Sequence, residues 1–263
     1  MNILILGGTS DANKIAKELK ELEKKLEKKD ITINIITTTT TNYGSELAKK
    51  YSDKVISRQS TQETLKEIII NNDIFLLIDA THPFAINVSK KAINLSKELN
   101  LKYVRYERPQ KIFKNAIYVN DFNEASYKAL EIMEDKNTKD KNIMYMAGIK
   151  NLKSVSDIIG KDRLIARVLP VSVNEALNEL PSKNIIGMHG VFSKELNKNI
   201  IIDYNCGIII TKDSGDSGGL TEKVEGALQA NAIPIIVQRP KINYPLKFNE
   251  INDLIEYINN IIF

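Results

Sequence analysis

Short, continuously apolar runs alternate along this chain with longer segments in which apolar residues recur at helical spacing. The first run, Asn2–Leu6, shows no alternation of polar and apolar residues, which predicts a strand buried on both faces. Ala12, Ile15, Ala16 and Leu19 then fall on one face of an amphipathic helix, with Lys and Glu on the other. The pattern therefore predicts a strand, a loop and a helix within the first 26 residues.

The same order repeats to the end of the chain. We expect further strands at 31–36, 54–57, 74–78, 102–105, 110–119, 142–146, 163–168, 185–187, 207–210 and 233–237. Helices are expected at 61–71, 87–99, 122–134, 172–180, 194–199, from about 220, and at 250–261. This alternation predicts an α/β fold of two doubly wound Rossmann-like domains with parallel sheets, at residues 1–110 and 111–263.

Composition narrows the class of protein. The one cysteine, Cys206, excludes an internal disulfide and a cysteine metal cluster, and we expect no bound metal. No apolar run reaches the length of a membrane span, so we expect a soluble, cytoplasmic protein without a membrane partner. The net charge of +4 is spread along the chain, so no nucleic-acid partner is expected, and the charge suits an anionic small molecule equally well.

The turn after the first strand resembles a nucleotide-binding turn. Gly7 and Ala12 occupy the first and last positions of the dinucleotide fingerprint, while Thr9 replaces its middle glycine. Thr9 or Ser10 is expected to cap the helix, whose first turn offers free N–H groups to a phosphate. Asp11 suits the helix dipole but would repel that phosphate.

The end of the second strand bears on the choice of cofactor. An acidic residue here binds the adenosine ribose in NAD-type folds, but this chain has a run of hydroxyls at 37–41, with Thr38 among them. Arg58, after the next strand, can reach a 2′-phosphate. The threonine run has a second interpretation, as an extension of a β-prone strand.

Polar residues also follow the strands expected at 74–78 and 102–105. Thr81 and His82 lie where doubly wound folds bind ligands, and His82 is either a structural or a catalytic histidine. Arg105 and Arg108 are candidates for bidentate contacts with carboxylates. The alternative for both arginines is ion pairing with Glu107 and contact with solvent.

The segment 208–227 carries the strongest ligand-binding pattern. An apolar strand leads into a loop of hydroxyls, charges and glycines, and a helix follows. Gly215 and the two glycines after it allow the backbone to approach a ligand closely, and Lys212, Ser214 and Lys223 add donors for carboxylate or phosphate. The alternative is a mobile surface loop built from ordinary turn residues.

Taken together and in order, these strand ends resemble the precorrin-6A reductase family of cobalamin biosynthesis. The segments that carry the resemblance are Leu6-Gly7-Gly8-Thr9, Asp79-Ala80-Thr81-His82-Pro83-Phe84-Ala85, Tyr106-Glu107-Arg108-Pro109, Arg167-Val168-Leu169-Pro170, Thr211-Lys212-Asp213-Ser214-Gly215, Gly218-Gly219, Glu222-Lys223 and Arg239-Pro240. The segment His189-Gly190-Val191-Phe192 departs from the Gly-Pro-Phe-like sequence that relatives often carry.

The resemblance implies two Rossmann-like domains with an interdomain cleft and a hydride transfer from NADPH or NADH to a tetrapyrrole rich in carboxylates. We assign the cofactor to Gly7, Gly8, Thr9, Ser10, Thr38, Arg58, Thr81 and His82 of the N-terminal domain. We assign the tetrapyrrole to Arg105, Arg108, Lys150, Arg167, Ser193, Lys212, Ser214, Gly215 and Lys223. The candidate proton donors are His82, Lys212, Asp213 and an ordered water.

Two other functions are consistent with the sequence. One is an NAD(P)-dependent reductase or epimerase of another anionic metabolite, although the chain has no Tyr-x-x-x-Lys pair of the short-chain dehydrogenase type. The other is a two-domain protein that binds an anionic ligand without catalysis. The composition, rich in Ile, Asn and Lys, is typical of AT-rich genomes, which are often those of anaerobes, and thereby favours a cobalt-containing substrate.

Overall fold

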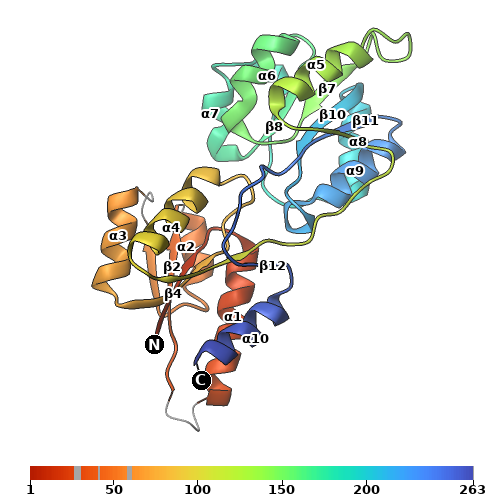
Figure 1. Cartoon of the computed structure of the whole chain (residues 1–263). Coiled ribbons are helices and arrows are strands. Elements are labelled where there is room, and N and C mark those ends of the chain that lie inside the picture. Colours follow the sequence, from red (N-terminus) through yellow and green to blue (C-terminus); the bar gives the residue numbers. More distant parts are fainter. Residues whose placement is uncertain (27–30, 41, 58–60, 263) are drawn as a thin grey trace. The chain divides into compact units, whose positions relative to one another are not determined.

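The computed structural model describes residues 1–26, 31–40, 42–57 and 61–262, and the chain forms two compact units (Figure 1). Unit 1 comprises residues 1–109 and 241–263, and unit 2 comprises residues 110–240. Each unit contains a six-stranded sheet in which all paired strands are parallel, with helices on its faces. The predicted fold class is therefore confirmed. Across the described residues, no helix is both long and apolar enough to cross a bilayer.

Unit 1 has the strand order β12-β5-β4-β1-β2-β3. Its strands are β1 Asn2–Leu6, β2 Asn34–Thr39, β3 Lys54–Ser57, β4 Ile74–Asp79, β5 Lys102–Tyr106 and β12 Lys247–Phe248. Its helices are α1 Ser10–Leu26, α2 Asn42–Ala48, α3 Gln62–Asn71, α4 Ile86–Glu98 and α10 Ile251–Ile262. The chain leaves β1 toward β2 on one side and later returns to β4 on the other, so the topological switch point lies between β1 and β4.

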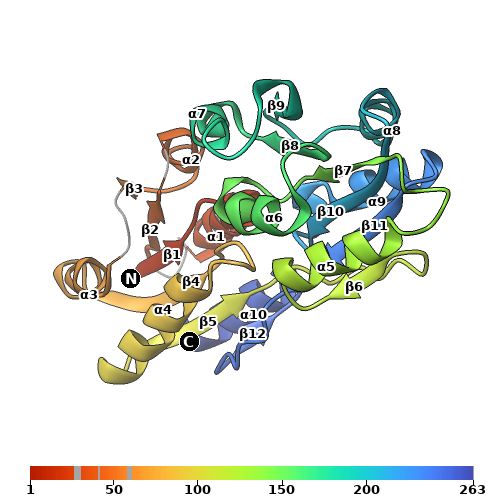
Figure 2. The ribbon, with the colours of Figure 1, turned by 90° about the horizontal axis from the view of Figure 1, so that it is seen from above.

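Unit 2 has the corresponding order β6-β11-β10-β7-β8-β9, and its strands can be followed from above in Figure 2. Its strands are β6 Ile117–Val119, β7 Asn142–Tyr145, β8 Leu164–Val168, β9 Ile185–Gly187, β10 Cys206–Lys212 and β11 Ile233–Val237. Its α-helices are α5 Phe122–Ile132, α6 Leu152–Ile159, α7 Val173–Ala176, α8 Lys194–Asp203 and α9 Leu220–Gln229, and short 3-10 turns are η2 Ile149–Asn151, η3 Pro170–Ser172, η4 Ser182–Asn184 and η5 Asp216–Gly218. The switch point here lies between β7 and β10.

The core of unit 1 explains why its helices lie where they do. The apolar face of α1, including Ile15 and Leu19, is completely buried against Ile3 and Ile5 of β1. Leu77 and its neighbours on the opposite face of the sheet pack against α3 and α4. Full burial of one such aliphatic side chain contributes about 1.5–3 kcal/mol. Burial on both faces accounts for the continuously apolar strands of the sequence.

The last segment of the chain corrects the predicted domain boundary. Residues 241–263 were assigned to the C-terminal domain, but they belong to unit 1 (Figure 1, dark blue). Phe248 of β12 pairs with Tyr106 of β5, and Leu254 and Ile258 of α10 join the core that contains Ile15 of α1. The apolar pattern shows that this segment forms a strand and a helix, but it does not specify which sheet edge the strand joins.

Several predicted elements differ in extent from the observed ones. The strand expected at 31–36 runs from Asn34 to Thr39, so the strand-extension interpretation holds for Thr37, Thr38 and Thr39. The region 110–119 is a strand only at 117–119. The helix expected at 172–180 is confined to η3 and the four-residue α7.

Candidate functional site

A cavity of about 150 Å³ opens in unit 1 at the carboxyl ends of β1, β2 and β4. Its lining includes the predicted cofactor residues Gly7, Gly8, Thr9, Thr38, Thr81 and His82. The structure thus brings these six residues of one unit together at the switch point, where doubly wound folds bind their ligands. Arg58 lies outside the described residues.

Two glycines shape the mouth of this cavity for different reasons. A Cβ on Gly7 would lie 2.7 Å from Cγ2 of Thr37 and 2.9 Å from the carbonyl oxygen of Thr38, so β1 and β2 require a glycine where they meet. Gly8 has φ of 85°, a conformation that favours glycine, and a Cβ there would meet no atom within 4 Å. The backbone at Gly8 is thus open to a ligand.

Thr9 joins two loops at the start of α1. Its hydroxyl accepts a hydrogen bond from the N–H of Ala12 at 3.1 Å and donates to the carbonyl oxygen of Ala80 at 2.7 Å. Thr9 is therefore the helix cap, and Ser10 is the first helical residue. Because its proton is donated to Ala80, the Thr9 side chain fixes the turn, and a phosphate would be bound here by backbone N–H groups of the helix start.

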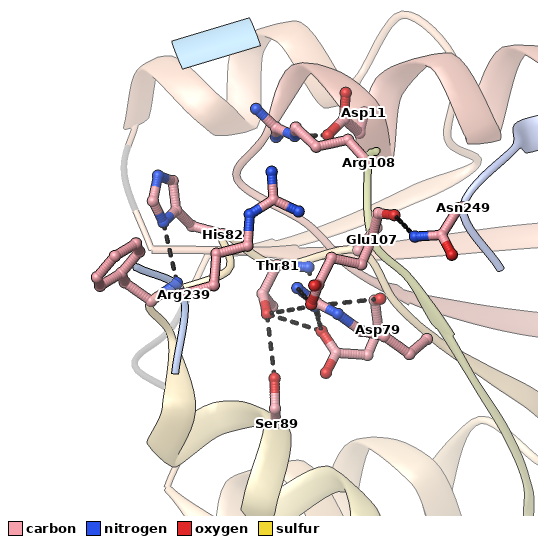
Figure 3. Close-up of polar contacts among 12 residues, drawn as sticks. Asp11, Asp79, Thr81, His82, Ser89, Glu107, Arg108, Arg239 and Asn249 are labelled. Carbon is pink, nitrogen blue, oxygen red and sulfur yellow. Dashed lines mark hydrogen bonds and ion pairs between the residues drawn. The ribbon is translucent and has the colours of Figure 1, made fainter. Parts of the chain in front are cut away.

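Arg108 reduces the electrostatic repulsion that the Asp11 carboxylate would exert on a phosphate. The guanidinium of Arg108, on the segment after β5, forms an ion pair with the carboxylate of Asp11 in the first turn of α1, and both side chains are nearly buried (Figure 3). The positive charge of Arg108 offsets the carboxylate that would repel an anion. Arg108, which we assigned to the tetrapyrrole from the sequence, thus lies beside the helix start of unit 1.

Arg105 is also not placed to bind a substrate. Its side chain is completely buried, and its Nη1 donates to Oδ1 of Asp79 at 2.7 Å and to the hydroxyl of Thr81 at 3.1 Å. Burial alone would lower the pKa of Arg105, but the negative charge of Asp79 acts in the opposite direction and the pKa is raised overall. The ion-pairing alternative holds in part, with Glu107 as a second partner at 3.5 Å.

Asp79 organises the floor of the cavity. Besides Arg105 it accepts hydrogen bonds from the hydroxyl of Tyr103 at 2.9 Å and from the hydroxyl and N–H of Thr81 at 2.7 and 3.1 Å. The hydroxyl of Thr81 also lies 3.5 Å from that of Ser89 on α4 (Figure 3). Because Thr81 donates its proton to Asp79, its role is to shape the cavity through this network.

His82 is held by the turn that it begins. Its Nδ1 accepts a hydrogen bond from the N–H of Phe84 at 3.2 Å, and its ring lies 5.8 Å from the ring of Phe84 (Figure 3). In the neutral imidazole this contact places the ring proton on Nε2. His82 therefore lines the cavity with a defined orientation, which agrees with either of its predicted roles.

In unit 2 the loop between β10 and α9 is built on a buried carboxylate. Oδ1 and Oδ2 of Asp213 lie 3.1 Å from Nη2 and Nε of Arg239, respectively, and the N–H of Gly215 donates to Oδ1 at 3.3 Å. Gly215 has φ of 67°, and a Cβ on Gly218 would lie 2.1 Å from Oγ of Ser214. Asp213 is thus an acceptor that fixes the loop, and these contacts argue against its predicted role as proton donor.

Four cationic side chains from different elements lie at the carboxyl edge of this sheet, and their positive charges repel one another. We call Lys150 of η2, Arg167 of β8, Lys212 of β10 and Lys223 of α9 the basic cluster. Burial lowers the pKa of Lys212, and the charge of Lys150 lowers it further. Burial lowers the pKa of Lys223 to about 7, with Arg167 and Lys212 contributing in the same direction.

Arg167 shows the character of this cluster. Burial lowers its pKa to about 10. Its Nη1 donates to the neutral side-chain oxygen of Asn197 at 2.8 Å, and its guanidinium lies 5.2 Å from the ring centre of Phe192. An amide and an aromatic ring orient the guanidinium without neutralising it. The cluster therefore suits an anionic ligand with several carboxylates.

Ser193 and His189 are set apart from this cluster by their contacts and exposure. The hydroxyl of Ser193 accepts a hydrogen bond from the N–H of Leu196 at 3.2 Å and caps α8. His189 is exposed. Over the described part of the chain, no group of three or more His, Cys, Asp or Glu side chains has the arrangement of a metal site.

Several contributors to these sites were not assigned from the sequence: Asp11, Asp79, Asn197, Glu222 and Arg239. Arg239 and Glu222 lie in segments that carried the family resemblance, which was the available signal for them. Asp79 lies two residues before Thr81 in another such segment, but its partner Arg105 lies 26 residues away. Local spacing does not reveal such a pair.

Comparison with known proteins identifies the family of the chain. The family profile described as "Precorrin-6x reductase CbiJ/CobK" matches residues 2–259. The chain is similar to the cobalt-precorrin-6A reductase of Methanococcus maripaludis (54% identity, covering 99% of this chain and 100% of the relative) and to that of Methanocaldococcus jannaschii (52% identity, 99% of each). A solved structure of CobK precorrin-6A reductase has the same fold, with a TM-score of 0.78 at 18% identity, covering 99% of this chain and 96% of that chain. The chain thus belongs to the precorrin-6x reductase CbiJ/CobK family, whose members are oxidoreductases of cobalamin biosynthesis.

Proposed function

We propose that this protein reduces cobalt-precorrin-6A with NADPH or NADH, that unit 1 binds the nucleotide, and that unit 2 binds the carboxylates of the macrocycle. The observation that carries the proposal is the basic cluster, in which burial and mutual repulsion lower the pKa of Lys212 and Lys223. Anionic side chains of a substrate would relieve that repulsion. The names of the relatives supply the substrate, and its cobalt is part of the substrate and not of the protein.

The first unit fits a dinucleotide. The open backbone at Gly8, the close packing at Gly7 and the start of α1 are the features that a pyrophosphate needs. The end of β2 carries Thr38 and Thr39 in place of the acid that binds a ribose, so we expect NADPH to be accepted. We also propose that Arg58 contacts the 2′-phosphate of NADPH.

In this mechanism a bound nicotinamide supplies the hydride to a macrocycle carbon, and the neighbouring carbon receives a proton. The contribution of the chain is to hold the reacting carbons about 3–3.5 Å apart and to keep the macrocycle in one orientation. Lys212 suits proton donation better than Asp213. Its lowered pKa makes the ammonium a stronger acid than an ordinary lysine, whereas the Asp213 carboxylate accepts hydrogen bonds from Arg239 and Gly215.

Two matched variants test the proposed division of labour. We expect Lys212→Ala to lower kcat/KM for cobalt-precorrin-6A at least tenfold, since a charge-assisted contact contributes roughly 1.5–3 kcal/mol, while the Kd for NADPH stays nearly unchanged. Gly8→Val should do the reverse and weaken nucleotide binding. Anaerobic turnover with each nucleotide and separate binding titrations measure both effects.

Three results would contradict the proposal. Equal losses of both ligands in either variant would remove the division between the units. Full activity of Lys212→Ala would exclude Lys212 from the substrate site. If the wild-type protein bound the macrocycle without oxidising NADPH or NADH, it would be a binding protein and not a reductase.

A further inference from the structure

The side-chain amide of Asn197 forms hydrogen bonds with three groups of unit 2. Asn197 lies on α8 and is 1% exposed. Its Oδ1 accepts a hydrogen bond from Nη1 of Arg167 at 2.8 Å, and its Nδ2 donates to the carbonyl oxygens of Phe192 at 3.1 Å and Ser193 at 2.8 Å. Because a carbonyl group can only accept, the two carbonyls require the amide NH₂ group, and the amide oxygen is the atom that remains for Arg167. The amide is therefore held in one orientation.

Close packing of two helices keeps Asn197 in this place. A Cβ on Gly226 of α9 would lie 2.8 Å from Cβ of Asn197 and 2.7 Å from the carbonyl oxygen of Lys194. The helix α9 can therefore approach α8 this closely because residue 226 is a glycine. The backbone N–H of Asn197 also donates to the carbonyl oxygen of Ser193 at 3.1 Å. The amide oxygen of Asn197 is thus a fixed acceptor for Arg167.

The contact with Asn197 leaves one edge of the Arg167 guanidinium for a ligand. The Nε and Nη2 groups of an arginine form one edge of the guanidinium, and Asn197 binds Nη1, which lies outside that edge. The ring of Phe192 packs on the face of the same guanidinium, 5.2 Å away. Among the described residues of unit 2, Arg167 has no carboxylate partner, and its side chain is not completely buried. The Nε and Nη2 edge is therefore oriented, charged and within reach of a ligand.

Another arginine of unit 2 shows how such an edge binds a carboxylate. Nε and Nη2 of Arg239 lie 3.1 Å from Oδ2 and Oδ1 of Asp213, respectively. Paired contacts of this kind between a guanidinium and a carboxylate are roughly twice as strong as hydrogen bonds between neutral groups. Arg167 presents the same edge without such a partner within the unit. The edge therefore suits a carboxylate that comes from a ligand.

We propose that Asn197 is a positioning residue for substrate recognition, which directs the Nε and Nη2 edge of Arg167 toward one carboxylate of the macrocycle and leaves the charge of Arg167 uncompensated until that carboxylate binds. This inference rests on the proposed function of unit 2. Asn197→Asp would keep the shape of the side chain, but it would neutralise Arg167 and turn an oxygen toward the carbonyl groups of Phe192 and Ser193. An amide supplies both the neutral acceptor and the donors that this position needs.

Two matched variants of α8 test the charge argument. Asn197→Asp should raise the Kd for cobalt-precorrin-6A about tenfold or more, because the new carboxylate competes with that of the macrocycle for Arg167. Asn199→Asp adds the same charge at an exposed position of the same helix and should bind like the wild type. The Kd for NADPH should stay unchanged in both variants. Anaerobic binding titrations measure these constants.

The outcomes of these titrations separate the inference from the proposed function. An unchanged Kd for the macrocycle in Asn197→Asp would overturn the inference and leave the proposed function intact. An equal loss in Asn199→Asp would also overturn it, because a general charge effect would then explain both variants. Failure of the wild type to bind cobalt-precorrin-6A would contradict the proposed function itself.

A double-mutant cycle separates positioning from a merely structural role. Asn197→Leu removes the three side-chain hydrogen bonds without adding a charge, and it should also weaken binding of the macrocycle. If Asn197 acts through Arg167, the same change should have little further effect on affinity in Arg167→Met protein. Losses of affinity that add in the double variant would overturn the inference. Circular dichroism at the temperature of the titration shows whether each variant is folded.

A crystal structure of the wild type with cobalt-precorrin-6A gives a test that does not depend on any variant. We expect both oxygens of one macrocycle carboxylate to accept from Nε and Nη2 of Arg167, with Nη1 still bound to Asn197. A carboxylate that displaces Asn197 from Nη1, or a bound macrocycle without a carboxylate on Arg167, would overturn the inference.

Discussion

The two units share one sheet order, but the ion pairs of unit 1 contrast with the basic cluster of unit 2. In unit 1, Arg105 pairs with Asp79 and Arg108 pairs with Asp11. Unit 2 has one buried pair of this kind, Arg239 with Asp213, but in its basic cluster Arg167 donates to a neutral amide and Lys223 donates to a backbone carbonyl oxygen. The ion pairs therefore fix loops of the fold, whereas the basic cluster retains an attraction for an external anion.

This contrast also separates stability from function. Removing one partner of a buried ion pair of good geometry strongly destabilises the fold, because the other charge is left without compensation. A cation held among other cations destabilises the empty protein, and its removal relieves that cost. Substitutions in the ion pairs of unit 1 and in the basic cluster of unit 2 should therefore change stability with opposite signs.

The largest expected effect is in unit 1. Asp79→Ala leaves Arg105 buried without its principal carboxylate, so we expect a loss of about 3–5 kcal/mol in the free energy of unfolding, measured by urea denaturation. The double variant Asp79→Leu with Arg105→Met replaces both charges by apolar groups and should recover much of that loss. A loss below 1 kcal/mol in the single variant would contradict the stabilising role that we assign to the ion pairs of unit 1.

Arg167→Met should show the opposite behaviour. Because Arg167 has a neutral partner in the free protein, we expect its removal to leave the stability unchanged or to raise it. The affinity for cobalt-precorrin-6A should fall by one to two orders of magnitude, which corresponds to roughly 1.5–3 kcal/mol for a charge-assisted contact. Thermal denaturation and a binding titration on the same preparation measure the two quantities, and a variant that loses stability but not affinity would refute the assignment.

The stability difference between Lys223→Met and the wild type should depend on pH. The folded-state pKa of Lys223 is lowered to about 7, so the folded protein binds fewer protons than the unfolded chain between about pH 7 and 10.5, and this group destabilises the fold most at low pH. The variant should therefore be more stable than the wild type at pH 6, and the gain should shrink as the pH rises above 7. Chemical denaturation at pH 6, 8 and 9 checks this, and a gain that grows with pH would contradict it.

The smallest effect compares two buried tyrosines. The hydroxyl of Tyr103 in unit 1 donates to Asp79 at 2.9 Å, whereas that of Tyr145 in unit 2 lies near the N–H of Asn151 without a hydrogen bond of good geometry. We expect Tyr103→Phe to cost about 1 kcal/mol and Tyr145→Phe to cost nearly nothing, as measured by urea denaturation. Equal costs would show that Tyr145 has a partner of comparable strength.

Much of the fold follows from the sequence because burial on both faces of a parallel sheet leaves a clear apolar pattern. The turn that lines the cavity of unit 1 was also recognisable, since the order of Gly7, Gly8 and Thr9 after a buried strand is a local signal. A ligand-binding role for Lys212 and Lys223 was predicted from the segment 208–227, which carries both, and stays a prediction. The structure adds their mutual repulsion with Arg167, which depends on elements far apart in the chain.

The errors have one physical origin. A charged residue on a strand can face solvent, a ligand or a buried partner, and the sequence around Arg105 does not distinguish these cases. Its burial is decided by Asp79, whose β4 pairs with β5. The place of β12 was missed for the same reason, because strand pairing is a long-range property that two residues of a short strand do not encode.

The position of β12 and α10 in unit 1 has a consequence for synthesis on the ribosome. Unit 2 is one uninterrupted stretch of chain, residues 110–240, whereas unit 1 lacks β12 and α10 until the last residues emerge. Unit 2 can therefore reach its native structure before unit 1, although the first residues of unit 1 are synthesised earlier. Until then the edge of β5 and the part of α1 that packs against α10 remain uncovered, so the incomplete first unit exposes an unpaired strand edge.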